Sequence, residues 1–101
     1  MSTSVAITRC NKDIEKSLKE AILTKGFTDL QSPIVIKPNI CTNNDRTGFA
    51  NTKVDIVEAI IRLLLEKQSN PVIRIAESDS GAKYADEVFE KFGYKDLEQR
   101  Y

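Results

Sequence analysis

Two short polar segments carry the residues best suited to chemistry. Lys37 follows the apolar run 34–36, and Glu77 and Asp79 follow a second β-branched run at 72–76. A lysine at the end of a buried strand can bind a phosphate or a carboxylate, or act as a base where burial lowers its pKa. Carboxylate oxygens are the ligands that a hard cation such as Mg²⁺ prefers. These residue types predict a site for a small anionic or metal-linked ligand.

Each assignment has a structural alternative that the sequence leaves open. A lysine that extends its ammonium to solvent at a strand end would equally explain Lys37. The hydroxyls and the carboxylate of residues 78–80 are also typical of a helix N-cap. An anion site at the helix start near Gly81 is a third interpretation, which the charges of Glu77 and Asp79 would oppose. The candidate ligand-binding residues are Lys37, Asn39, Asn51, Thr52, Ser78, Ser80 and Gly81, and the candidate metal ligands are Glu77 and Asp79.

Composition argues against several classes of function. Fifteen basic and fifteen acidic residues cancel, so no net field favours nucleic acid or an anionic membrane. The chain has no histidine, which removes the commonest general base and a common metal ligand. Cys10 and Cys41 match no zinc or redox spacing, and two separated cysteines cannot hold a four-cysteine iron–sulfur cluster. No nucleotide-binding or hydrolase motif is present, so the sequence names no reaction.

The N-terminal residues 1–4 lead directly into a strand-like run, without a basic segment or a long apolar stretch. No signal peptide is therefore expected. The longest unbroken apolar run, 63–65, is far too short to span a bilayer. We expect a cytoplasmic protein that makes no membrane contact and keeps its cysteines as free thiols.

The elements that position the candidate residues alternate between strand and helix. Hydrophobic patterning predicts strands at 5–9, 34–37 and 72–76, and helices at 12–25, 53–67, 83–92 and 94–101. The order β-α-β-α-β-α predicts an α/β sandwich of two or three layers around a small parallel sheet, in one domain over residues 1–101. The continuous apolar run 34–36 predicts a strand buried on both faces. So small a sheet leaves a free edge, so either the domain is incomplete or a partner covers that edge.

Two further segments bear on the site. Residues 38–51 form a long polar loop, a feature that is usually functional or mobile in compact domains. It ends at Thr52, which with Asp55 resembles a capping box.

The helix at 53–67 is too apolar to be exposed, so it either packs deeply under the sheet or contacts another subunit or domain. Because ligands of open α/β sheets bind beyond the carboxyl ends of the strands, segments 37–39 and 77–81 are expected on one edge.

Three segments taken in order resemble the domain-of-unknown-function 362 family. They are Ile34-Val35-Ile36-Lys37-Pro38-Asn39, the apolar helix from Val54 to Leu65, and Phe89-Glu90-Lys91-Phe92-Gly93-Tyr94. The family's acidic or Gly-Asp-Ser turn corresponds in character to Ala76-Glu77-Ser78-Asp79-Ser80. The resemblance implies a fold and the location of a site, but no reaction.

Many members of that family continue for roughly another domain, and some carry ferredoxin-type cysteines that this sequence does not have. The resemblance therefore implies that the chain corresponds to the N-terminal half of such a protein. The expected partners are a C-terminal domain or further copies of the chain, together with a small-molecule ligand. Two functions remain consistent with the sequence. The chain could be a domain of an α/β enzyme that binds such a ligand. Alternatively, it could be a non-catalytic interaction or oligomerisation module that acts through the sheet edge or helix 53–67. A role in electron transfer is the weakest hypothesis.

Overall fold

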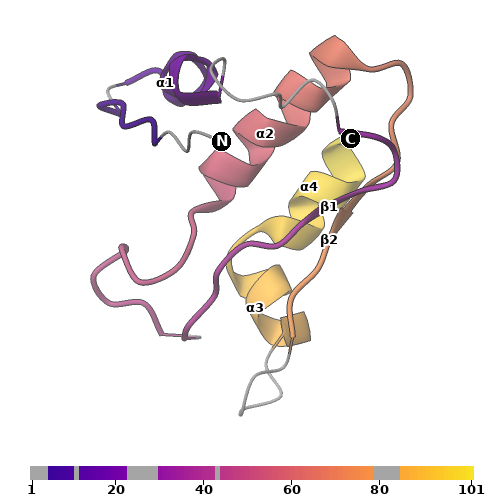
Figure 1. Cartoon of the computed structure of the whole chain (residues 1–101). Coiled ribbons are helices and arrows are strands. Elements are labelled where there is room, and N and C mark those ends of the chain that lie inside the picture. The colour runs from indigo at the N-terminus through magenta and orange to yellow at the C-terminus, as the bar shows by residue number, and fades with distance from the viewer. Residues whose placement is uncertain (1–4, 11, 23–29, 43, 79–84) are drawn as a thin grey trace.

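The computed structural model describes residues 5–10, 12–22, 30–42, 44–78 and 85–101. Within these ranges it contains four helices and a two-stranded parallel sheet (Figure 1). The predicted small α/β fold with a parallel sheet is thus confirmed. The elements are α1 (Ile14–Ile22), β1 (Ile34–Ile36), α2 (Val54–Lys67), β2 (Ile73–Ile75), α3 (Ala85–Lys91) and α4 (Tyr94–Arg100).

The sheet pairs β1 with β2 in parallel, with Ile34 opposite Ile73 and Ile36 opposite Ile75. Its inner side packs on a core formed by α2 and α4, in which Val57, Ile61, Tyr94 and Leu97 are buried. The middle residue of β1, Val35, is 59% exposed. The prediction that β1 is buried on both faces is therefore wrong, because the described helices cover one face only.

Residues 5–9 do not form the predicted first strand. This segment lies against α1 instead. The Thr8 hydroxyl donates to the Ser17 carbonyl oxygen at 2.9 Å, and the Ser17 hydroxyl donates to the Arg9 carbonyl oxygen at 3.1 Å. An alternating β-branched run has strand propensity, but a strand forms only where a neighbouring backbone completes its hydrogen-bonded ladder. Among the described residues the order is therefore α-β-α-β-α-α rather than β-α-β-α-β-α.

Helix α2 is covered within the chain on more than one side. Its residues Val57, Ala59, Ile61, Leu63 and Leu64 are buried. Helix α1 packs along it, while the sheet and α4 share the core cluster that contains Val57 and Ile61. The helix therefore shows deep packing within the chain, the first of the two interpretations of its apolar composition. No helix in the described part of the chain is long and apolar enough to cross a membrane.

The helix ends follow the predictions only in part. Thr52 does not cap α2: the helix begins after Lys53, and no side chain caps it. Gly93 separates α3 from α4 as predicted, with φ of 88°, a left-handed conformation that glycine adopts without steric cost. The predicted start of α3 near residue 83 and the predicted end of the first helix near residue 25 lie outside the described residues.

Candidate functional site

The carboxyl ends of β1 and β2 bring together four of the predicted residues: Lys37, Asn39, Thr52 and Glu77, here called the strand-end site. Because the strands are parallel, their ends meet at the same edge of the sheet, which is the usual ligand position in open α/β folds. The Lys37 ammonium nitrogen lies 3.3 Å from Oε1 of Glu77, although the two residues are forty positions apart. The predicted juxtaposition of the two strand-end segments is therefore observed.

Glu77 connects the two strand ends. Only 6% of its side chain is exposed. Its Oε2 accepts the Ile40 backbone N–H at 3.1 Å, and its Oε1 accepts the Ser78 backbone N–H at 2.8 Å. Burial acts to raise the pKa of Glu77, but these N–H donors and Lys37 outweigh it and hold the pKa below the ordinary value. The carboxylate thus stays ionised and fixes the start of the long loop against the end of β2.

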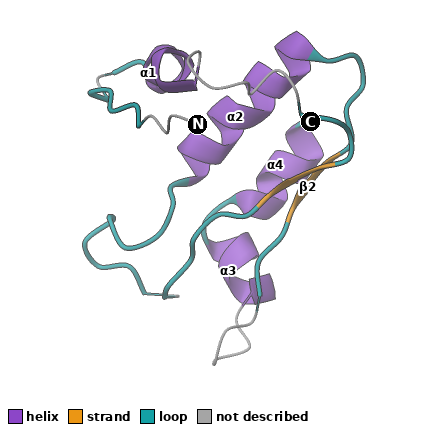
Figure 2. Cartoon of the chain, in the orientation of Figure 1, coloured by secondary structure: helices purple, strands orange, loops and turns teal. Residues whose placement is uncertain are grey.

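Lys37 and Asn39 differ in how they are held. The side chain of Lys37 is 60% exposed, so its ammonium group reaches solvent while one side contacts Glu77. The Asn39 backbone N–H donates to the Thr52 hydroxyl at 3.0 Å, and the Thr52 N–H donates back to the Asn39 carbonyl oxygen at 2.8 Å. This reciprocal pair closes the base of the loop between β1 and α2, which Figure 2 shows as one long connection.

Tyr94, a buried residue of α4, forms a hydrogen bond with the backbone of Thr52. Its hydroxyl donates to the Thr52 carbonyl oxygen at 2.7 Å. Burial of the ring raises the pKa of Tyr94 to about 12, because the charged phenolate would be desolvated, so the hydroxyl remains a donor. The loop base is thereby anchored to the core through α4.

Asn51 holds the loop interior rather than facing a ligand. Its side-chain oxygen accepts the backbone N–H groups of Cys41 at 2.7 Å and Thr42 at 3.2 Å. Its side-chain nitrogen donates to the Thr42 carbonyl oxygen at 2.7 Å. These contacts involve both the oxygen and the nitrogen of the side-chain amide, so in this structure Asn51 shapes the loop.

Asp45 completes the loop and was not among the predicted residues. Its carboxylate accepts the backbone N–H groups of Asn51, Ala50 and Gly48, each at 3.0 Å, and the Thr47 hydroxyl at 3.0 Å. The hydrogen bond from the Asn51 backbone N–H is the largest cause of the lowered pKa of Asp45. The signal in the sequence was the run from Asp45 to Gly48, because an aspartate before a glycine is typical of side chain-to-backbone turns.

The acidic turn after β2 is described only as far as Ser78. That residue is exposed and donates its backbone N–H to Glu77. The predicted site residues Asp79, Ser80 and Gly81 lie outside the described residues, so the choice between a metal site and a helix cap is untested there. Within the described ranges, no three His, Cys, Asp or Glu side chains are grouped to hold a metal ion. Cys10 and Cys41 lie at exposed positions, and neither forms a disulfide.

Comparison with known families gives one match. The model of the family described as "Domain of unknown function (DUF362)" matches residues 34–101, which is most of the chain. The chain belongs to this family.

All candidate residues of this DUF362 chain lie inside the matched region, which begins at the first residue of β1. Helix α1 and the segment before it precede the match. Comparisons with curated proteins and with solved structures gave no match. The family description names no activity, so a function for the DUF362 chain has to be argued from the geometry of the strand-end site.

Proposed function

We propose that this chain binds a small anionic ligand at the strand-end site, with the Lys37 ammonium as the main charged contact. The main support for this proposal is the exposure of Lys37 beside a covered carboxylate. Glu77 is almost completely covered and holds Lys37 at the carboxyl end of β1, yet the Lys37 side chain is 60% exposed. A lysine ammonium has three N–H donors, so those that do not face Glu77 remain available to a ligand.

The charge around the site supports an anion. The segment 37–53 contains three basic residues, Lys37, Arg46 and Lys53, and a single acidic one, Asp45, in a chain whose net charge is zero. The Asp45 carboxylate is directed at the N–H groups of its own loop, while Arg46 and Lys53 are exposed. Residues 38–53 thus carry a net charge of +1, which offsets the negative charge of Glu77 and leaves Lys37 as the charge that attracts an anion.

The contacts of Glu77 favour an anion over a metal-linked ligand. Both of its oxygens already accept N–H donors, from Ile40, Ser78 and Lys37. A cation bound by this carboxylate would have to displace those donors and repel Lys37. A phosphate or carboxylate ligand needs no such rearrangement.

Thermal-shift and calorimetric titrations with inorganic phosphate and with succinate test the proposal. We expect at least one of these anions to stabilise the wild-type protein, because a ligand that binds only the folded state raises its stability. Lys37→Ala should abolish the stabilisation. The matched control is Lys67→Ala, which removes an exposed lysine from the far end of α2. The assignment fails if neither anion binds, or if Lys37→Ala binds as the wild type does.

A further inference from the structure

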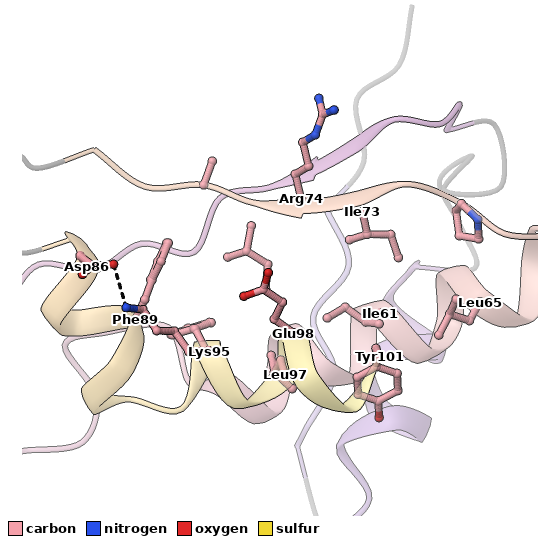
Figure 3. Close-up of a pocket in the computed structure, with 14 residues that line it drawn as sticks. Ile61, Leu65, Ile73, Arg74, Asp86, Phe89, Lys95, Leu97, Glu98 and Tyr101 are labelled. Atoms are coloured by element: carbon pink, nitrogen blue, oxygen red, sulfur yellow. Dashed lines mark ion pairs between the residues drawn. The ribbon is translucent and has the colours of Figure 1, made fainter.

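An apolar groove runs between β2 and the helices α3 and α4. Its volume is about 730 Å³. Its walls include Ile61, Ile73, Ile75, Phe89 and Leu97, and the ribbon of β2 forms one side along its length (Figure 3). The groove lies beside β2 rather than at the strand ends, so it is separate from Lys37 and the loop at 38–52.

The edge of β2 above this groove is a template for another strand. The backbone of Val72 accepts the Ile34 N–H at 2.8 Å, and the Ala76 N–H donates to the Ile36 carbonyl oxygen at 3.0 Å. Backbone groups alternate sides along a strand, so those of Ile73 and Ile75 point away from β1. In the part of the chain that the structure describes, β1 is the only strand paired with β2. The outer ladder is therefore available to an extended segment.

Glu98 is one of four charged residues that line the groove, together with Arg74, Asp86 and Lys95. Figure 3 shows its carboxylate directed from α4 toward β2, into the groove. Lys95, one turn earlier on α4, is paired with Asp86 at 2.8 Å. Arg74 points away from the helices. Among the described residues Glu98 has no ion pair of its own, so a strand with apolar residues and one basic residue would complement the groove.

Residues 5–9 have this character. In the extended conformation Val5, Ile7 and Arg9 share one face, because side chains alternate along a strand. Val5 is 83% exposed and Ile7 is 91% exposed, although both are large apolar residues. The segment is attached to α1 through Ser17, and Figure 1 places it near the N-terminus, across α2 from β2 and α4. It therefore cannot reach the groove of its own chain without releasing α1.

We propose that residues 5–9 of a second copy of this chain add as a strand to the free edge of β2. Val5 and Ile7 then enter the groove, and Arg9 lies against Glu98. Two identical chains can exchange these segments reciprocally and form a closed dimer. The inference does not depend on anion binding at the strand-end site.

Sedimentation velocity from roughly 10 μM to 1 mM, a range suited to weak association, tests the proposal. We expect the wild type to dimerise in this range and Ile7→Asp to raise the dissociation constant at least about tenfold. The matched control is Phe49→Asp, because Phe49 is as exposed as Val5 at 83% but lies on the loop of the strand-end site. Circular dichroism checks that each variant remains folded.

Exchanging the charges of Arg9 and Glu98 tests whether these two side chains are in contact across the dimer. Arg9→Glu and Glu98→Arg should each weaken the dimer by several-fold, and the double variant should recover most of the loss. Recovery supports the predicted pairing of Arg9 with Glu98. The proposal is overturned if the wild type is monomeric throughout the range, if Phe49→Asp weakens the dimer as much as Ile7→Asp does, or if the double variant shows no recovery.

Discussion

The strand-end site and the groove beside β2 share a strand but are built in opposite ways. In the strand-end site most polar groups already have partners: Glu77 accepts three donors, and Asn39 and Thr52 bond each other. In the groove most of the lining residues are apolar, and Glu98 has no ion pair among the described residues. The first arrangement fixes a small polar surface before any ligand arrives. The second leaves apolar surface and backbone groups for a larger partner.

The largest expected effect is the loss of stability when a buried residue of the groove wall is truncated. Leu97 is 1% exposed and belongs to the core, whereas Leu65, at the rim, is 44% exposed. Leu97→Ala should lower the free energy of unfolding by about 2–5 kcal/mol, because it removes buried methyl groups and leaves a cavity. Leu65→Ala should change it by less than about 0.5 kcal/mol. Urea denaturation measures both, and similar losses would mean that the groove wall is not part of the core.

The next effect compares the two glutamates. Glu77→Ala should cost about 1–3 kcal/mol, because it removes the acceptor of the Ile40 and Ser78 N–H groups. Glu98→Ala should be close to neutral, since it breaks no ion pair seen in the structure. Both values come from the same denaturation experiment. If Glu98→Ala proves the more destabilising, the contrast between a closed site and an open groove is wrong.

The dependence of stability on pH sharpens the role of Glu77. Its pKa is held below the ordinary value of 4.5, so its contribution is complete above that pH and is lost as the pH falls through the lower, folded-state pKa. Glu77→Gln should therefore flatten the loss of stability below about pH 4.5. Some slope should remain from Asp45, whose pKa is also lowered. Denaturation between pH 3 and pH 7 tests this, and an unchanged slope in Glu77→Gln would contradict it.

The smallest expected effect is that of Lys37 on stability. Its pair with Glu77 is mostly exposed on the lysine side, and such pairs contribute about 0–1 kcal/mol. Lys37→Ala should therefore unfold at nearly the wild-type urea concentration. A loss comparable with that of Glu77→Ala would show that Lys37 mainly stabilises the fold.

Local patterns predicted the elements that carry the strand-end site. The apolar runs before Lys37 and Glu77 indicated strands, and the parallel topology placed their ends together. The strand at 5–9 was predicted wrongly because propensity cannot supply a neighbouring backbone. Thr52 was assigned to a helix cap, whereas its hydroxyl accepts the Asn39 N–H across the loop base.

Other features depend on packing between distant residues. Val35 has the same apolar character as its neighbours in β1, but no described element covers its face. The direction of Glu98 is set by how α4 lies under β2, which no local pattern encodes. Asp45 could have been found from its turn signature, but the number of loop amides that it accepts follows only from the folded loop.

Nuclear magnetic resonance can show residue by residue whether an anion binds beside Lys37. Inorganic phosphate is titrated into the ¹⁵N-labelled protein while the backbone amide signals are followed. We predict that the largest changes occur at Asn39, Ile40, Thr52 and Ser78, whose N–H groups surround the strand ends, and that Lys37→Ala removes them. Saturating changes confined to the groove, or no saturating change at the strand ends, would show that phosphate does not bind at the strand-end site.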